Sequence, residues 1–295
     1  MRTLATASGE ADLDQLEEVA RRIRVQIVRT VYLAGAGHMG GSLSEADILA
    51  ALYFHVMRIR PAEPGWPERD RFVLSKGHSS PGLYATLALR GYFSTDELPS
   101  FDSLGTRLQG HPDMTRLPGL DMSTGSLGMG ISAAVGIALG NRLQGRAART
   151  YVLLGDGECQ EGEVWEAAFI GARYGLDHLI AIVDHNRLQQ YGWPGATPDD
   201  RLPPAQPGEL VAKWTAFGWR VIELDGHDMA RIVHAFDQAG RADGRPVALI
   251  ASTVKGRGVS FAENRYFWHM RVPTAEEFAV AMAELGEPAA EETAR

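Results

Sequence analysis

The chain has 295 residues, of which 45% are hydrophobic and 22% charged, and this composition is typical of a globular protein that can bury a full core. Its formal net charge of −8 argues against a nucleic-acid partner, because nonspecific nucleic-acid binding needs a basic surface. The single cysteine, Cys159, excludes an internal disulfide and a cysteine-based zinc site, and the lack of a signal-peptide-like or membrane-spanning apolar run predicts a cytoplasmic protein with no membrane partner.

The first half of the chain is predicted to consist mainly of helices joined by glycine-rich turns. Apolar residues recur at near-helical spacing over residues 10–34, which predicts an amphipathic helix. A glycine-rich turn, GAGHMGGSLS, follows, and then a second apolar helix, EADILAALYFHVM. The remaining predictions for this half are a loop at 60–70, a short strand at RFVLS, a helix at 82–90, mostly loop at 100–130 and a tightly packed helix at 131–145.

Strand-like runs alternate with amphipathic helices in the second half. The runs are TYVLL, HLIAIVD, WRVIEL and VALIAST, and the helices are expected near 162–175, 208–217 and 228–242. This alternation indicates an α/β fold of three layers, α/β/α, with a mainly parallel sheet. Because no Pro- or Ser-rich linker divides the chain, we expect a single domain over 1–295, with a helical N-terminal portion at about 10–60 and a mobile tail at about 286–295.

Polar residues follow the predicted strands at the edge where an open parallel sheet binds its ligands. Asp156, in GDGECQEGEVWEAA, follows YVLL, and Asn186, Asp225 and Lys255 follow later strands. A carboxylate, an amide oxygen and a backbone carbonyl suit a hard cation such as Mg2+, which would neutralise a bound diphosphate so that fewer lysines are needed. Gly157 would let the backbone approach this ligand closely. The alternative is that GDG forms only a turn.

The stretch GDGECQEGEVWEAAFIGARYGLDHLIAIVDHN resembles the thiamine diphosphate signature, in the form found in the transketolase family. The resemblance implies the thiamine diphosphate-binding fold, with thiamine diphosphate and Mg2+ as cofactors and Ca2+ or Mn2+ as possible substitutes for the metal. It implies that Asp156, Asn186 and the backbone carbonyl of Leu188 hold the metal, and that Gly157 lies against the diphosphate. His185 replaces an asparagine that is common in the family, at a position that is not a presumed ligand.

Four histidines in Gly- or Pro-flanked turns match further segments of the transketolase family. They are His38 in AGHMGGSLS, His78 in SKGHSS, His111 in QGHPD and His269 in YFWHMRVP. A single loop histidine is more often a solvated surface residue, but by resemblance His78 and His269 reach the diphosphate. His38, His111 and His269 would face the sugar substrate as catalytic groups, because imidazole donates and accepts protons near neutral pH. His227, in DGHD, also matches a family motif and is interpreted as structural or as a residue that supports the site from outside it.

The segment STGSLGMG resembles the loop that covers the cofactor in this family. By resemblance, Gly125, Ser126 and Leu127 would present backbone groups to the aminopyrimidine and thiazolium rings. The alternative is a glycine-rich start of a helix. Met129 stands where the family often has glutamine, so a polar contact at this position is open.

Two further positions near the cofactor signature are interpreted with alternatives. Glu161 matches a glutamate that links paired active sites in transketolases and contributes to the cofactor site; alternatively, it is an acid favoured by the dipole of a helix N-terminus. Gln190 and Tyr191 replace an apolar residue and an aspartate of many relatives, so cofactor contacts by their side chains are open. Cys159 is expected to be inert packing, because no base lies beside it in sequence.

The resemblance runs from about residue 15 to 280 and covers only the first portion of a full transketolase. Full-length relatives continue into a pyrimidine-binding domain, which supplies the glutamate that activates the cofactor, and a C-terminal domain. The chain thus resembles the N-terminal subunit of a split, two-chain transketolase. This implies a C-terminal partner subunit in an α2β2 heterotetramer, and transfer of a two-carbon ketol unit from a ketose phosphate to an aldose phosphate, in the pentose phosphate route or a side pathway.

Other functions stay open. The chain could be a subunit of another thiamine diphosphate enzyme, such as a 2-oxoacid dehydrogenase, which usually lacks the GHMGGSLS and SKGHSS loops, or a deoxyxylulose-phosphate synthase, which is normally a longer single chain. A noncatalytic regulatory subunit is a third alternative, against which the intact histidines argue. The sequence does not identify the donor sugar, although an ordinary pentulose phosphate is favoured over a branched sugar phosphate or a sulfonated ketose.

Overall fold

The computed structural model describes residues 11–190 and 207–287, which fold around a parallel β-sheet. Its strands are β1 (Arg71–Leu74), β2 (Thr150–Gly155), β3 (Leu179–His185), β4 (Arg220–Asp225) and β5 (Val247–Ser252). They lie in the order β1-β2-β3-β5-β4, and every neighbouring pair is parallel. The predicted parallel sheet is therefore confirmed, and each strand boundary lies within one residue of the expected run.

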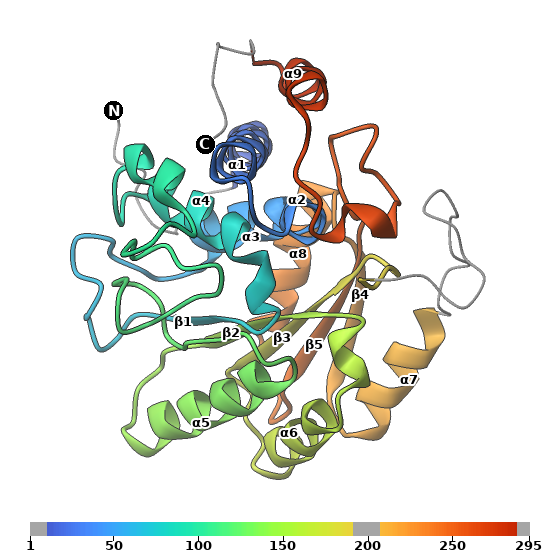
Figure 1. Ribbon diagram of the computed structural model, residues 1–295. Coiled ribbons are helices and arrows are strands. Elements are labelled where there is room, and N and C mark those ends of the chain that lie inside the picture. Colours follow the sequence, from blue (N-terminus) through green and yellow to red (C-terminus); the bar gives the residue numbers. More distant parts are fainter. Residues whose placement is uncertain (1–10, 191–206, 288–295) are drawn as a thin grey trace.

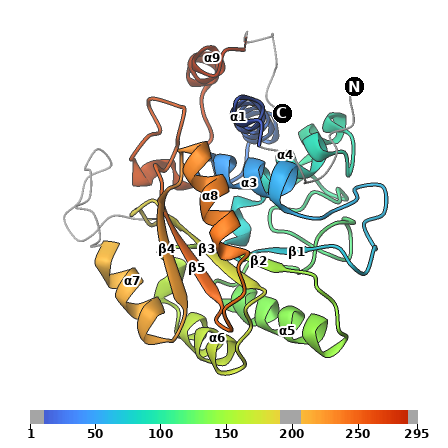
Figure 2. The same cartoon turned by 180° about the vertical axis from the view of Figure 1, so that it is seen from behind.

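Helices cover both faces of the sheet and complete the predicted three layers (Figure 1). The helices on one face are α5 (Met129–Leu143), α6 (Gly162–Arg173) and α7 (Pro207–Ala216). Those on the other are α1 (Leu13–Ala34), α2 (Met39–Ser44), α3 (Ala46–Ala51), α4 (Ser80–Arg90) and α8 (Met229–Ala239). Figure 2 shows α8 over the sheet from behind. The last helix, α9 (Ala275–Glu284), packs on α1, where the rings of Tyr32 and Phe278 stack 4.1 Å apart.

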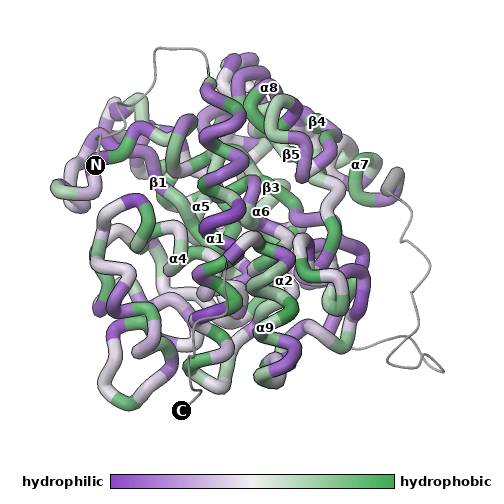
Figure 3. The backbone as a smooth tube through the Cα atoms, turned by 90° about the horizontal axis from the view of Figure 1, so that it is seen from above, coloured by the Kyte–Doolittle hydropathy of each residue, from purple (hydrophilic) through white to green (hydrophobic). Residues whose placement is uncertain are grey.

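The strands are apolar along their whole length because successive side chains point into opposite layers. In β2, Tyr151 and Leu153 belong to the core shared with α1, α3 and α8. Val152 and Leu154 belong to the second core, under α5, α6 and α7. The surface helices need only one apolar face, and α1 accordingly alternates between hydrophilic and hydrophobic residues (Figure 3).

The N-terminal helical portion is more broken than the sequence predicted. The expected turn GAGHMGGSLS is helical from Met39, where α2 begins, and the expected second helix is divided into α3 and a π-helical turn at Leu52–Val56. A side chain at Gly40 would come within 2.7 Å of the carbonyl oxygen of Trp268. The glycines here therefore allow close packing, and they do not mark an open turn.

Short 3-10 turns and loops complete the described part of the chain. The 3-10 turns are Gly77–Ser79, Thr95–Ser100, Glu158–Gln160 and Tyr266–His269. The predicted mobile tail lies outside the described residues from 288 onward. Across 11–190 and 207–287, no helix combines the length and apolarity that a membrane crossing requires.

Candidate active site

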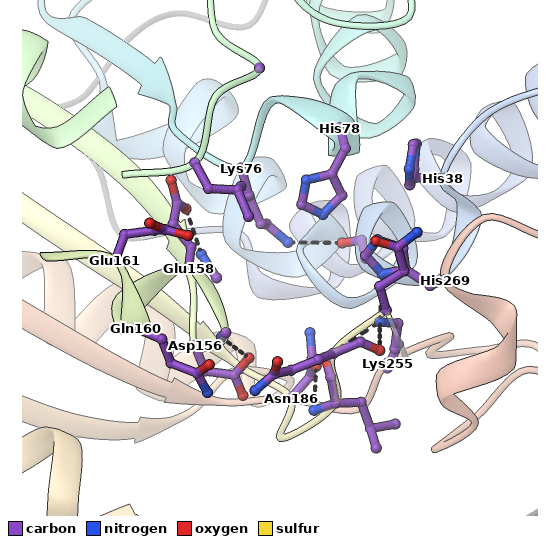
Figure 4. Close-up of a pocket in the computed structure, with 18 of the residues that line it drawn as sticks. His38, Lys76, His78, Asp156, Glu158, Gln160, Glu161, Asn186, Lys255 and His269 are labelled. Carbon is purple, nitrogen blue, oxygen red and sulfur yellow. Dashed lines mark hydrogen bonds between the residues drawn. The ribbon is translucent and has the colours of Figure 1, made fainter. Parts of the chain in front are cut away.

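A cavity of about 380 Å³ opens at the carboxyl end of the strands (Figure 4). All but one of the site residues that the sequence predicted line it. They are His38, His78, His111, Gly125, Leu127, Asp156, Gly157, Glu161, Asn186, Leu188 and His269. The exception is Ser126, which is exposed and does not line the cavity. Segments that are far apart in sequence thus meet where the topology of a parallel sheet leads us to expect a ligand.

Asp156 follows β2 in the wall of the cavity. Its carboxylate accepts hydrogen bonds from two backbone amides, that of Gly157 at 2.8 Å and that of Arg187. Burial and the negative charge of Asp184 raise the pKa of Asp156 to about 6. The carboxylate is therefore held in place by neutral groups, in surroundings that favour the approach of a cation.

The turn after β3 brings the other two predicted metal ligands beside Asp156. The side-chain oxygen of Asn186 accepts a hydrogen bond from the Leu188 amide at 3.1 Å, and its Nδ2 donates to Asp184 at 3.1 Å. Between them, Arg187 has a φ of 66°, which is uncommon outside glycine, and this turn directs its amide to Asp156. Strands β2 and β3 are neighbours, so their tips lie together.

Histidines from four segments form one side of the cavity. The ring centroids of His38, His78 and His269 are 4.9 to 5.1 Å apart, and His111 lies 6.2 Å from His38. Burial, followed by the charge of His111, lowers the pKa of His38 to about 4. Burial, followed by the charge of Lys76, lowers the pKa of His78 to about 2, and burial lowers that of His269 as well. These three rings are therefore neutral near pH 7.

The buried side chain of Lys255 also lines the cavity, although the sequence prediction did not include it among the site residues. Its Nζ lies 2.9 Å from Nδ1 of His269 and 3.4 Å from the carbonyl oxygens of Leu188 and Gln189. Burial lowers the pKa of Lys255 to about 8. When Lys255 donates to Nδ1, the proton of a neutral His269 ring is on Nε2.

A second buried lysine, Lys76, also lines the cavity and links three segments. Its Nζ is 2.5 Å from Asp184, 2.8 Å from Glu45 and 3.0 Å from the carbonyl oxygen of Gly41. Burial would lower the pKa of Lys76, but Asp184 and Glu45 raise it above its usual value. The sequence led us to expect fewer lysines at a metal-bound diphosphate, and two lysines, Lys76 and Lys255, line the cavity. The signal was in the sequence, because both lysines follow strands.

Other residues of the cavity wall were also missed by the sequence prediction. They are Gly41, Gly155, Glu158, Gln160 and Gln189, whereas Gln190, which the sequence left open, lines the cavity. Glu161 is the N-cap residue of α6, and its side chain forms no capping hydrogen bond. Gln190 donates a long contact to the sulfur of Met270, at 3.8 Å, whereas Tyr191 lies outside the described residues. Cys159 is a buried free thiol, as expected.

The sheet edge also carries a separate hollow of about 540 Å³ beyond β4 and β5, and Asp225 and His227 lie there. Of the four polar strand ends that the sequence singled out, Asp225 is therefore the one that does not share the main cavity. The ring of His227 approaches Asp47 with Nδ1 at 2.7 Å and accepts from the Val254 amide through Nε2 at 2.8 Å. Both nitrogens have partners inside the protein, which agrees with a structural role.

A parallel α/β sheet with a carboxylate, an amide and a cluster of histidines at its carboxyl edge defines an α/β protein with a polar ligand site at that edge. The sequence profile described as "Transketolase, thiamine diphosphate binding domain" matches residues 15–292. The chain therefore belongs to the transketolase family and corresponds to its N-terminal, thiamine diphosphate-binding subunit.

Individual relatives extend this result. The chain is 46% identical over 277 residues to the 6-deoxy-6-sulfo-D-fructose transketolase subunit SqwG of Clostridium sp. (strain MSTE9), and this match covers 94% of the chain and 98% of the relative. It is 41% identical over 275 residues to an apulose-4-phosphate transketolase subunit of Phocaeicola vulgatus, covering 93% and 95%. Among solved structures, the transketolase of Leishmania mexicana has a TM-score of 0.83 at 28% identity, covering 97% of this chain and 43% of that one. The chain thus spans less than half of that solved transketolase.

Proposed function

We propose that this chain, as a single domain over residues 1–295 in the cytoplasm, works with a C-terminal partner subunit to transfer a two-carbon ketol unit from a ketose phosphate to an aldose phosphate. The observation that carries the proposal is the meeting of Asp156, Asn186 and Leu188 with the histidine cluster in one cavity, in a chain of the transketolase family. A noncatalytic role would not require this combination to be intact.

The donor groups fit a magnesium ion. Asp156 would supply a carboxylate oxygen, Asn186 its amide oxygen and Leu188 its backbone carbonyl, and Mg2+ prefers such oxygen ligands while keeping positions for phosphate. In the described ranges, no group of three or more His, Cys, Asp or Glu side chains is placed to hold a metal, so a site for a soft metal finds no support. Ca2+ and Mn2+ are expected to substitute, since the same oxygens suit them.

Cofactor binding is assigned to groups on both sides of the metal position. Thiamine diphosphate, when bound, supplies the carbon nucleophile that breaks and remakes a carbon–carbon bond next to a carbonyl. Gly157, His78 and His269 would contact its diphosphate, and Lys255 would add a positive charge beside them. The backbone of Gly125 and Leu127, with the Glu161 side chain nearby, would border its rings, and Ser126 between them would contribute its backbone.

The histidines would handle the sugar. Because His38 is neutral near pH 7, it can donate one hydrogen bond and accept another from a substrate hydroxyl. His269 would present its Nε2 proton, because Lys255 occupies Nδ1. His111 would complete the set, 6.2 Å from His38. These groups would orient hydroxyls and move protons at the carbons that react.

A second polypeptide is supported by apolar residues at the cavity. Leu127 in its wall is exposed, and so are Met129 at the start of α5 and Met270, which follows His269. Exposed apolar groups beside a polar cavity are typical of a surface that another protein covers. Both near-full-length relatives are named as subunits. We propose a partner with pyrimidine-binding and C-terminal domains, in an α2β2 heterotetramer.

Two arguments, one from the family and one from individual relatives, bear on the identity of the sugar donor. The family as a whole favours an ordinary pentulose phosphate. The names of the two near-full-length relatives favour 6-deoxy-6-sulfo-D-fructose or apulose 4-phosphate as a second candidate. All three are ketoses that offer the same two-carbon unit, and they differ in the rest of the sugar.

The test combines this chain with a C-terminal subunit encoded beside it, thiamine diphosphate and Mg2+. Ketol transfer is then measured with the three donors and a panel of aldose phosphates. We expect activity only when both subunits and both cofactors are present, and a loss of at least about 100-fold in His38→Ala. Cofactor-dependent 2-oxoacid oxidation, or no turnover of any ketose by a complex that binds the cofactor, would contradict the proposal.

A further inference from the structure

Glu158 is a buried carboxylate at the cavity that the proposed function does not use. It is 2% exposed and lies in the 3-10 turn directly after Gly-Asp-Gly. One carboxylate oxygen accepts hydrogen bonds from the Ser75 hydroxyl at 2.6 Å and the Gly128 amide at 2.9 Å. The other accepts from the Gly155 amide at 3.1 Å. A single side chain thus joins the end of β1, the start of α5 and the end of β2.

The segment that Glu158 holds is packed backbone against backbone. A side chain at Gly130 would come within 2.6 Å of the Ser75 Cα, and one at Gly77 would come within 2.6 Å of the Thr124 hydroxyl oxygen. Gly128 has a φ of 84°, which glycine adopts without strain. The loop over residues 124–128 therefore has little apolar side-chain packing to keep it in place. Its position depends on close fit and on polar bonds.

Both oxygens of the Glu158 side chain act as acceptors in these three bonds. Its position at the N-terminus of α5, a helix of 15 residues, favours a negative charge. A glutamine could not accept all three bonds, because its NH2 group would face either the Gly155 amide or the Gly128 amide.

We propose that Glu158 is a positioning residue whose carboxylate clamps the Gly125–Gly128 loop against the ends of β1 and β2. The clamp sets the position of the wall formed by Gly125 and Leu127. That this wall borders thiamine diphosphate rests on the proposed function, whereas the clamp itself belongs to the chain without cofactor.

The test compares Glu158→Gln with wild type and with a matched control, Glu163→Gln. Glu163 bonds to Ser132 between α5 and α6, so its variant makes the same chemical change outside the loop. Hydrogen exchange of residues 124–130, measured on the full chain without cofactor, should be about tenfold faster in Glu158→Gln, because a bond to a charged group is lost. Exchange in β3 should change less than twofold, and Glu163→Gln should match wild type in the loop.

Cofactor affinity provides the second readout. At saturating Mg2+, with the partner subunit present, Glu158→Gln should bind thiamine diphosphate about five- to tenfold more weakly, with Glu163→Gln unchanged. Ser75→Ala removes one of the three bonds and should give an intermediate exchange rate; it replaces Glu158→Gln as the test if that variant does not fold. The clamp is wrong if loop exchange stays within twofold of wild type, or if it rises equally in β3. If wild type itself does not bind the cofactor, the proposed function fails, while the exchange comparison still decides the clamp.

Discussion

Two carboxylates show how differently the layer of α3 and the carboxyl edge of the sheet are built. Asp47, on α3, accepts two hydrogen bonds from the guanidinium of Arg24, one of them at 3.1 Å, and lies 2.7 Å from the ring of His227. Asp156, at the cavity, accepts hydrogen bonds from two backbone amides. The first carboxylate has its counter-charges within the chain, and the second is held by neutral groups.

The pKa values express the same contrast. Burial would raise the pKa of Asp47, but Arg24 and His227 lower it to about 2. Burial and Asp184 raise the pKa of Asp156 to about 6. The difference shows that the chain supplies its own cations, Arg24 and His227, to the buried carboxylate of Asp47, which lies away from the cavity. At the cavity, Asp156 has only backbone amides as hydrogen-bond donors, and this fits the proposed metal site.

The largest expected effect is on the stability of the fold, at the cluster of Asp47, Arg24 and His227. Asp47→Ala leaves Arg24 buried without its counter-charge, and we expect a loss of about 3–5 kcal/mol in the free energy of unfolding. Urea denaturation measures this loss. Cofactor affinity of the folded fraction should not change. Asp47→Asn is the matched control, with a smaller loss because it keeps one acceptor. A loss below about 1 kcal/mol in Asp47→Ala would show that the charged partners of Asp47 contribute little to stability, and Asp47 would then not differ from Asp156 in this respect.

The next effect concerns the carboxylate of Asp156, which is hydrogen-bonded only to backbone amides. In wild type, thiamine diphosphate and Mg2+ at 100 times the Kd should stabilise the fold by about 2.7 kcal/mol. In Asp156→Ala this ligand-dependent stabilisation should vanish, while stability without ligand changes by less than about 1 kcal/mol, because no ion pair is broken. Thermal unfolding with and without ligands measures both quantities. If the variant binds as well as wild type, the metal assignment is wrong.

The contribution of Asp47 to the stability of the fold should depend on pH. The folded pKa of Asp47 lies below its ordinary value of 3.8, so its contribution is present above pH 3.8 and is lost as the pH falls towards 2. The lost contribution is roughly 2 kcal/mol. We expect the stability difference between wild type and Asp47→Asn to narrow over this window. A difference that is constant from pH 5 to pH 2 would contradict the lowered pKa.

The smallest expected effect concerns the two buried lysines, Lys255 and Lys76, and it extends the comparison from carboxylates to cations. Lys255→Met removes a buried charge beside His269 without leaving a carboxylate unpaired, so stability should hold while affinity for thiamine diphosphate falls about tenfold. Lys76→Met is the matched control, since it strands Glu45 and Asp184 and should lose stability first. Isothermal titration calorimetry measures the affinity of both variants for thiamine diphosphate, and urea denaturation measures their free energy of unfolding. Equal stability losses would show that Lys255 is structural as well.

Much of the site could be predicted from sequence because it is built from strand ends. Asp156 and Asn186 follow apolar runs in the alternating half of the chain, so a parallel sheet must bring them to one edge. Lys255 was equally visible as a strand end, but its partnership with His269 was not, since the two are joined only through folding. Glu158 lies inside the recognised signature, and its contact with Ser75 spans 83 positions.

By itself, the sequence determined the parallel sheet, the family and the edge at which the ligand site lies, because these follow from local periodicity and from motifs that are contiguous in the chain. Only the tertiary structure decided which charges neutralise one another. It paired Lys76 with Asp184 and Glu45, gave Asp47 its partners, and assigned Asp225 to a separate hollow. The physical reason is that an ion pair and its pKa shifts depend on distances and burial, which chain order does not encode.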